Sequence, residues 1–200
     1  MLDDLSHNDF FEQLQVDNEV LAQAHLLFSE PLLPDPNFSR TLIYLSKHNE
    51  SGSVGFILNK PTGLMLTDVL EIDIPIDFHL FMGGPVEPYG LFFLHSIGEE
   101  ISDAIEVEPG IYWGGNFEEI KSLIQQGRLD ETQIKFFSGY SGWGEGQLED
   151  ELEEKSWLVK KRGEVNPFDD LSKKSWNSIL KNFGGKHKLL ASFPEDPSHN

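Results

Sequence analysis

The sequence predicts an α+β fold in which strands dominate and helices lie between hairpins. Residues 40–47 and 53–60 read RTLIYLSK and SVGFILNK, two nearly continuous apolar runs. The HNESG segment between them has the length and chemistry of a hairpin loop, and we expect both runs to be central strands buried on both faces. Helical periodicity is limited to short stretches and does not alternate strictly with strands, which argues against a doubly wound parallel sheet. The 200 residues, 38% of them apolar, suit a single compact domain.

An acidic extension opens the chain, and one domain follows it. We assign residues 1–22 to the extension, where Ser6 can cap a short helix, and residues 23–200 to the domain. The first half of the domain has the pattern of strands separated by turn residues. The predicted strands are 24–31, 40–47, 53–60, 79–85 and 89–96, with a Pro-punctuated loop at 31–40, a short helix or turn at 66–72 and a Gly-Gly-Pro turn between the last two strands.

The second half of the domain contains the clearest helix, at residues 116–127. Asn116 caps it, Glu119 completes a pair resembling a capping box, and Gly127 ends it. The other predicted elements are short strand pieces at 104–115 with a bend at Pro109–Gly110, a strand at 132–140, a helix at about 145–155, a strand at 155–162 and a helix at about 170–183.

Charge is the most unusual bulk feature of the chain. Thirty-four acidic residues outnumber 15 Lys and Arg, so the formal net charge is −19. Residues 1–150 hold 6 basic and 26 acidic side chains, whereas 151–200 hold 9 and 8. Such an acidic body disfavours wide contact with nucleic acid or anionic lipid. We interpret the basic run KKR at 160–162 as facing the protein's own acidic body.

A glycine-rich stretch at residues 138–158 reads SGYSGWGEGQLEDELEEKSWL. A phosphate loop would continue into a Lys and a Ser or Thr, but Glu145 and Gln147 follow the glycines here. A nucleophile elbow would require a glycine where Trp143 stands, which weakens the case for Ser141 as a nucleophile.

The carboxylates that follow the glycines are better explained by structure than by ion binding. The acids at 149–154 do not follow the order of a calcium loop. We interpret them as a solvated helix face on which Glu151 pairs with Lys155. The whole stretch therefore predicts a strand-to-helix turn covered by the rings of Tyr140 and Trp143.

Several common chemistries lack the residues they need. The chain has no cysteine, which excludes disulfides, thiolate metal sites and thiol redox catalysis within it. Its seven histidines form no HxxxH or HxH pair, so we predict no metal site and no cofactor. The first ten residues, MLDDLSHNDF, do not resemble a secretory signal, and no apolar stretch approaches the ~20 residues that span a bilayer. We therefore expect a cytoplasmic protein without a membrane partner.

Four stretches of the chain carry a likeness to one known family. They are DPNFSRTLIYLSKHNESGSVGFILNKP (35–61), LFMGGPVEPYGLFFLHS (80–96), WGGN (113–116) and FSGYSGWGEGQLEDELEEKSWL (137–158). Together they resemble the bacterial YqgE/AlgH family. The resemblance implies curled, barrel-like antiparallel sheets flanked by helices, and some family members are labelled transcriptional regulators. Tyr89 departs from the Arg that we would expect before Gly90.

The resemblance brings no agreed catalytic residues, and its recurring stretches have the character of turn and packing chemistry. Those stretches are Asn59-Lys60-Pro61, Gly83-Gly84-Pro85-Val86 and Gly142-Trp143-Gly144. The candidate surface or pocket residues are Asn59, His95, Ser141, Trp143 and Gln147.

Three functions remain open from the sequence. We expect first a regulatory or interaction protein without catalysis, whose partner is another protein with a basic face. The second is a hydrolase-like enzyme that uses Ser141 or His95. The third is direct DNA binding through Lys160, Lys161 and Arg162. The sequence leaves the oligomeric state open.

Overall fold

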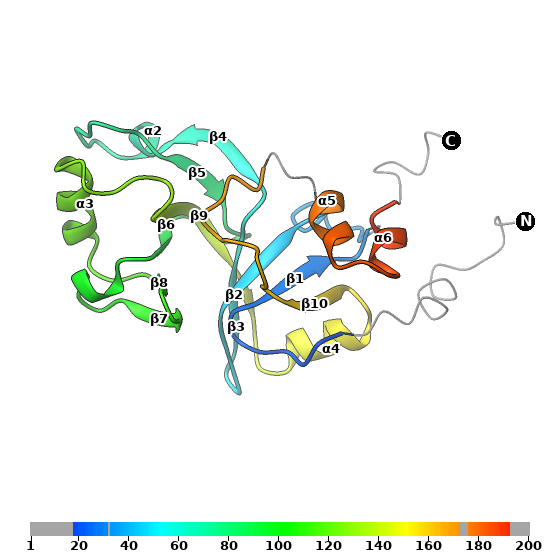
Figure 1. The fold of residues 1–200 in the computed structure, drawn as a ribbon. Helices are drawn as coiled ribbons and strands as arrows, with labels where there is room; N and C mark the ends of the chain where they lie inside the picture. The colour runs from blue at the N-terminus through cyan, green and yellow to red at the C-terminus, as the bar shows by residue number, and fades with distance from the viewer. Residues whose placement is uncertain (1–17, 32, 173–175, 193–200) are drawn as a thin grey trace, which may run out of the picture.

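The computed structural model describes residues 18–31, 33–172 and 176–192 (Figure 1). Ten strands form a mostly antiparallel sheet with the order β10-β1-β2-β3-β9-β6-β8-β7, to which β4 and β5 are attached as a branch. The strands are β1 His25–Ser29, β2 Leu42–Asn49, β3 Gly52–Ile57, β4 Pro61–Met65, β5 His79–Met82, β6 Val86–His95, β7 Ile105–Glu108, β8 Ile111–Trp113, β9 Ile134–Trp143 and β10 Trp157–Lys161. The predicted α+β class is confirmed, although the sheet does not close into a barrel.

The helices are short and lie at the two ends of the molecule. They are α2 Leu66–Val69, α3 Phe117–Gln125, α4 Gln147–Glu153, α5 Trp176–Asn182 and α6 His187–Leu190, with a 3-10 turn η1 at Gly98–Glu100. Figure 1 shows α3, β7 and β8 at one end, α4, α5 and α6 at the other, and β9 between them. No helix in the described ranges is both long and apolar enough to span a bilayer.

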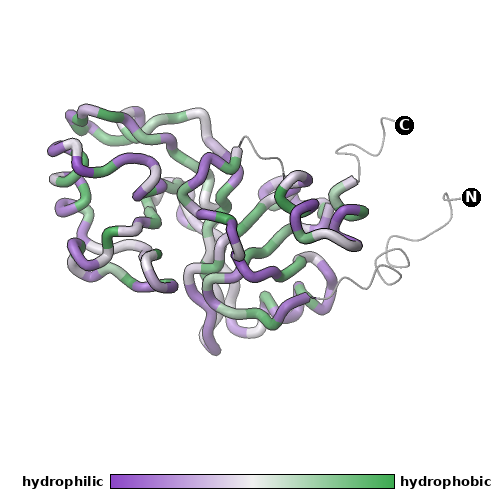
Figure 2. The backbone as a smooth tube through the Cα atoms, viewed as in Figure 1, coloured by the Kyte–Doolittle hydropathy of each residue, from purple (hydrophilic) through white to green (hydrophobic). Residues whose placement is uncertain are grey.

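The predicted hairpin of β2 and β3 is confirmed. The strands pair antiparallel from Ile43 opposite Ile57 to Asn49 opposite Gly52, with an irregularity between Leu45 and Lys47. The first five residues of β2 are buried, whereas the hairpin tip is hydrophilic and exposed (Figure 2). The apolar runs therefore form central strands because both of their faces pack against other elements.

The strand β9 is longer than its sequence predicts. A turn was expected after residue 140, but the strand continues to Trp143, and burial alternates with a period of two from Ser138 onward. The turn is confined to residues 144–146, because the glycines within 138–143 serve strand pairing rather than chain reversal. This correction matters because β9 is the strand that joins the two halves of the sheet.

The Gly-Gly-Pro segment after β5 was expected to be a turn between two neighbouring strands, but it joins strands that lie on opposite sides of β9. The strands β5 and β6 do not pair with each other; Phe136 of β9 pairs with Leu80 of β5 on one side and with Phe93 of β6 on the other. The chain must therefore cross β9 between Met82 and Val86.

That crossing requires backbones to approach more closely than a Cβ atom allows. A Cβ on Gly83 would lie 2.1 Å from the carbonyl oxygen of Gly139, and one on Gly84 would lie 2.3 Å from the main chain of Tyr140. Hydrogen bonds hold the crossing in place, since Gly83 N donates to Ser138 O at 2.9 Å and Ile57 N donates to Gly83 O at 3.0 Å. The glycines are thus structural requirements of this junction.

Two details of the predicted helices need correction. Asn116 does cap α3, accepting from Glu118 N at 3.0 Å. Glu119, however, does not complete a capping box, because its carboxylate accepts from Ser102 N at 2.7 Å and Ser102 Oγ at 2.8 Å. The final predicted helix, at about 170–183, corresponds to α5, which ends before Gly184 and Gly185 with their positive φ angles, and the short α6 beyond these glycines was not predicted. The helix predicted within residues 1–17 lies outside the described residues.

The last residues of the predicted N-terminal extension lie along the edge of the sheet. Glu19 N donates to Val159 O at 3.2 Å, and Val159 N donates to Asn18 Oδ1 at 2.9 Å. These bonds cover the outer edge of β10, which would otherwise expose unpaired backbone groups. The division into extension and domain stays a prediction.

We predict that Gly83→Ala lowers the free energy of unfolding by about 2 to 3 kcal/mol, because the new methyl group overlaps backbone atoms that cannot move aside. Equilibrium unfolding in urea measures the change. Gly144→Ala is the matched control, since its Cβ would meet only Gln147 Oε1, at 3.9 Å. Equal midpoints for Gly83→Ala and the wild type would contradict the close crossing.

Candidate functional site

The structure does not bring Ser141 and His95 together. His95 pairs with Ile134 at the start of β9, whereas Ser141 lies seven positions further along the same strand. At about 3.3 Å per strand residue, this separates them by roughly 20 Å. Both residues are fully buried, and Ser141 Oγ donates to Gly83 O at 3.0 Å. The pair therefore has no catalytic geometry, and Ser141 instead supports the glycine crossing.

The surroundings of His95 are those of a packed strand-end residue. Its Nε2 lies 2.9 Å from Gly114 O and therefore donates to that carbonyl. The imidazole stacks on Tyr112 with ring centroids 5.8 Å apart. Burial lowers the pKa of His95, and the hydrogen bond to Gly114 opposes this only in part. His95 is thus a neutral imidazole within the core at neutral pH.

Asn59 fastens two segments of main chain. Its Oδ1 accepts from Leu42 N and its Nδ2 donates to Arg40 O, each at 2.9 Å. It also lines an open pocket of about 590 Å³ together with Lys60 and Ser138. Both polar atoms of the Asn59 side chain are engaged by backbone, so its role is to hold the start of β2 against the end of β3.

Trp143 and Gln147 converge on Glu151, which differs from the predicted Glu151–Lys155 pair. One oxygen of the Glu151 carboxylate accepts from Trp143 Nε1 at 2.9 Å and from Trp157 Nε1 at 2.7 Å, and the other accepts from Gln147 Nε2 at 3.0 Å. The two indoles pack edge to face with centroids 5.8 Å apart. This carboxylate fixes α4 to β9 and β10, because bonds between ionised and neutral groups are stronger than neutral ones.

With Glu151 directed inward, the other acids within and next to α4 are exposed, and we call them the acidic ridge. Leu148 lies buried beneath the helix, opposite these exposed side chains. His48 contacts the ridge, with its Nε2 3.7 Å from Glu149 Oε1. The ridge comprises Glu145, Glu149, Asp150, Glu153 and Glu154.

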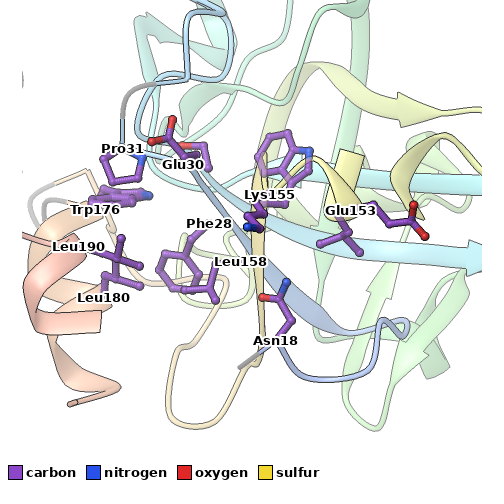
Figure 3. A pocket seen from close by; sticks show the side chains of 13 residues that line it. Asn18, Phe28, Glu30, Pro31, Glu153, Lys155, Leu158, Trp176, Leu180 and Leu190 are labelled. Atoms are coloured by element: carbon purple, nitrogen blue, oxygen red, sulfur yellow. The ribbon is translucent and has the colours of Figure 1, made fainter. Parts of the chain in front are cut away.

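A pocket of about 580 Å³, lined by both apolar and polar side chains that include Asn18 and Glu30, lies between the sheet and the C-terminal helices (Figure 3). We call it the helix–sheet pocket. Its volume is within the range typical of ligand sites. The acidic ridge reaches its rim through Glu153, with Lys155 beside it. The apolar lining comes from β1, the adjoining Pro31, α4, β10, α5 and α6, namely Phe28, Pro31, Leu152, Trp157, Leu158, Trp176, Leu180 and Leu190.

Trp176 gives this pocket a directional polar group. The side chain is 3% exposed, and within the described residues its Nε1 has no hydrogen-bond partner. Figure 3 shows the nitrogen-bearing edge of the indole turned toward the pocket. The guanidinium of Arg40 lies 5.3 Å from the ring centroid and helps to hold it. A buried donor without an acceptor costs free energy.

A second pocket, of about 620 Å³, surrounds Lys135 of β9. We call it the Lys135 pocket. Lys135 is 5% exposed; its Nζ donates to Asp169 O at 2.6 Å and lies 4.4 Å from the centroid of the Phe81 ring. Burial lowers the pKa of Lys135 to about 8, although the carboxylates of Asp170, Asp169 and Glu131 oppose the shift.

The basic run KKR mostly contacts the protein itself. Arg162 Nε donates to Glu108 Oε1 at 2.6 Å, and Tyr44 OH donates to the same oxygen at 2.8 Å. Burial and the neighbouring carboxylate raise the pKa of the Tyr44 phenol. Lys160 is 8% exposed. The interpretation that this run faces the protein's own acids is therefore confirmed for Arg162.

Sequence reasoning missed the two residues that give the pockets their polarity. Lys135 stands within the apolar run QIKFF, and a charged side chain in a buried strand is a signal that could have been read. Trp176 lies within the predicted helix at about 170–183, but its unpaired Nε1 has no sequence signal. Among the described residues, no group of three or more His, Asp or Glu side chains is placed to hold a metal ion.

We predict that the free energy of unfolding of the wild type, measured relative to that of Lys135→Met, increases by roughly 3 kcal/mol as the pH rises from 8 to 10.5. This interval separates the lowered pKa of Lys135 from the ordinary lysine pKa. Below this interval both folded and unfolded chains carry the proton, and the folded state bears the full cost of a buried charge. Within it the folded amine loses its proton first, so the cost disappears.

Urea unfolding at a series of pH values measures this difference, and Lys121→Met controls for the loss of an ordinary surface amine. The raised pKa of Tyr44 is common to all variants and cancels in the comparison. Parallel pH profiles for the wild type and Lys135→Met would show that the amine is not perturbed.

Comparisons with known proteins agree with this fold and extend over nearly the whole chain. Residues 26–188 match the family model described as DUF179, AlgH-like. A UPF0301 protein of Cytophaga hutchinsonii is 42% identical over 182 residues, covering 90% of this chain and 100% of that protein. A UPF0301 protein of Chlorobaculum tepidum is 40% identical over 91% of this chain and 97% of its own length.

Two solved structures resemble this one. The solution structure of the AlgH protein from Pseudomonas aeruginosa superposes with a TM-score of 0.69 at 28% identity, covering 90% of this chain and 98% of that one. A crystal structure of a protein from Corynebacterium diphtheriae has a TM-score of 0.74 at 17% identity over 92% and 97% of the two chains, and this likeness concerns the fold alone. The chain therefore belongs to the AlgH-like family of UPF0301 proteins.

Proposed function

We propose that this protein is a non-catalytic cytoplasmic interaction protein that receives an apolar segment of a basic partner protein in the helix–sheet pocket. The observation that carries the proposal is the pocket of about 580 Å³, with a large apolar part to its lining and the acidic ridge at its rim. Apolar anchors of a partner would fill the space between Phe28, Trp157 and Leu180, and flanking Lys or Arg side chains would meet the ridge. Peptide segments bind protein grooves in this way.

The negative charge of the acidic ridge favours a basic partner protein in the pocket over segments of this chain. Residues 1–17 contain five carboxylates and no Lys or Arg, so their apolar side chains would bring like charge to the ridge. A second copy of the chain brings a formal net charge of −19. Like charges placed together disfavour both occupants, whereas a basic partner gains affinity and an increased association rate.

The unpaired indole N–H of Trp176 supports a peptide as the occupant. A peptide in an extended or helical-terminal conformation presents carbonyl oxygens that need donors. The Trp176 Nε1 at the pocket wall is such a donor. This pairing gives the pocket directional specificity in addition to its apolar surface.

The two alternative functions find less support in the geometry. A hydrolase based on Ser141 and His95 would need both groups at one point, and they lie at opposite ends of β9. Direct DNA binding would need the whole basic run, but Lys160 is buried and Arg162 pairs with Glu108, which leaves Lys161 as the exposed member of the three. Any regulatory role would accordingly act through contact with another protein.

We predict that a fluorescein-labelled peptide with two Leu, one Phe and four Lys residues binds the full chain. Trp176→Phe should weaken binding about fivefold or more, because Phe keeps an aromatic ring but loses the indole N–H, whose hydrogen bond contributes ~1 kcal/mol. Glu153→Lys should weaken binding by a similar factor. Fluorescence anisotropy measures both effects.

Glu118→Lys on α3 is the matched control, because it changes the net charge equally at the opposite end of the molecule (Figure 1). A peptide with Glu in place of Lys tests the charge preference. If Trp176→Phe binds like the wild type, or if Glu118→Lys and Glu153→Lys have the same effect, binding is diffuse attraction to an acidic protein. A dimer or an occupied pocket in the free chain would also overturn the proposal.

A further inference from the structure

We propose that the Lys135 pocket is a binding site for a small uncharged carbonyl compound, an aldehyde or ketone, which Lys135 holds as an imine. The site is separate from the helix–sheet pocket and does not depend on the function proposed for it. It combines an amine at the wall of a cavity with apolar surface to hold the ligand body.

The position of the amine is set by three elements. Lys135 extends from β9, its Nζ lies over the ring of Phe81 from β5, and it donates to Asp169 O in the segment before α5. Within the described residues this is the one hydrogen bond that Nζ makes. It holds the amine at a fixed point and leaves its other hydrogen-bonding positions available to a ligand. The cavity beside it measures about 620 Å³.

Burial makes this amine more nucleophilic at neutral pH than a surface lysine. With a pKa of about 8, about one quarter of the Lys135 amines are neutral at pH 7.5, compared with about one in a thousand for an ordinary lysine. Lysines in apolar surroundings are the groups that form Schiff bases with carbonyl substrates in proteins. The ring of Phe81 provides such a surface directly beneath Nζ.

The walls of the cavity select the charge of the ligand. The carboxylates of Glu131, Asp169 and Asp170 line it and disfavour phosphate or carboxylate groups. His79 lies at the same wall, with its Nδ1 2.7 Å from Glu131 Oε1. The apolar part of the lining accepts a hydrocarbon or aromatic body and consists of Pro61, Phe81, Ile134 and Phe168.

The reaction needs no oxidant, reductant or metal. The Nζ lone pair attacks the carbonyl carbon, the C=O π pair moves to oxygen, and one N–H proton transfers to that oxygen, which gives a carbinolamine. The nitrogen lone pair then forms the C=N bond as the C–O bond breaks. Hydroxide leaves with the second N–H proton as water, so an amine and a carbonyl compound become an imine and water.

The test is reductive trapping of the full chain with benzaldehyde and cyanoborohydride at pH 7.5, followed by peptide mapping by mass spectrometry. We expect Lys135 to be benzylated at least about tenfold faster than Lys121, because of its larger neutral fraction. The rate at Lys135 should rise with pH and level off above about 8. The 4-carboxybenzaldehyde probe should label Lys135 more slowly than benzaldehyde.

All lysines of one wild-type sample are compared, so the result does not depend on a variant that folds poorly. Lys135→Arg should abolish the fast labelling phase, and Lys121→Arg should leave it unchanged. Labelling confined to surface lysines, or labelling of Lys135 only in denaturant, would overturn the site and show that the amine solely anchors the segment at Asp169. Equal rates with both aldehydes would overturn the assigned ligand charge.

Discussion

The passage of Gly83 and Gly84 across β9 is the constraint on which the rest of the structure depends. Main-chain atoms of Gly139 and Tyr140 occupy the positions that a Cβ atom on Gly83 or Gly84 would take. The segment after β5 can therefore pack against β9 only if it carries glycine at these two positions. The crossing places β5 and β6 on opposite sides of β9. It thereby lets one strand belong to both halves of the sheet.

Both pockets follow from this arrangement. The end of β9 beyond the crossing carries Trp143. The indole N–H groups of Trp143 and Trp157 both donate to Glu151, and these bonds hold α4 beside the helix–sheet pocket. The beginning of β9, before the crossing, carries Lys135 and the second pocket. A single strand thus positions the acidic ridge near one end and the buried amine of Lys135 near the other.

Local features of this fold could be predicted from the sequence, and long-range ones could not. The β2–β3 hairpin and the Asn116 cap depend on neighbouring residues, and the structure confirms both. The glycines of β9 carry the same local signal as turn glycines, and only their contact with Gly83, more than fifty positions away, shows that they belong to a strand. The pockets were missed for the same reason, because each gathers residues from distant segments.

Native-state hydrogen exchange tests the central claim most directly. Two backbone amides form the hydrogen bonds of the crossing: Ile57 N donates to Gly83 O, and Gly83 N donates to Ser138 O. If the crossing holds the two halves of the sheet together, these amides exchange only through global unfolding, at the same free energy as the amides in the middle of β9. Exchange of either amide through local opening, at a clearly lower free energy than that of β9, would contradict it.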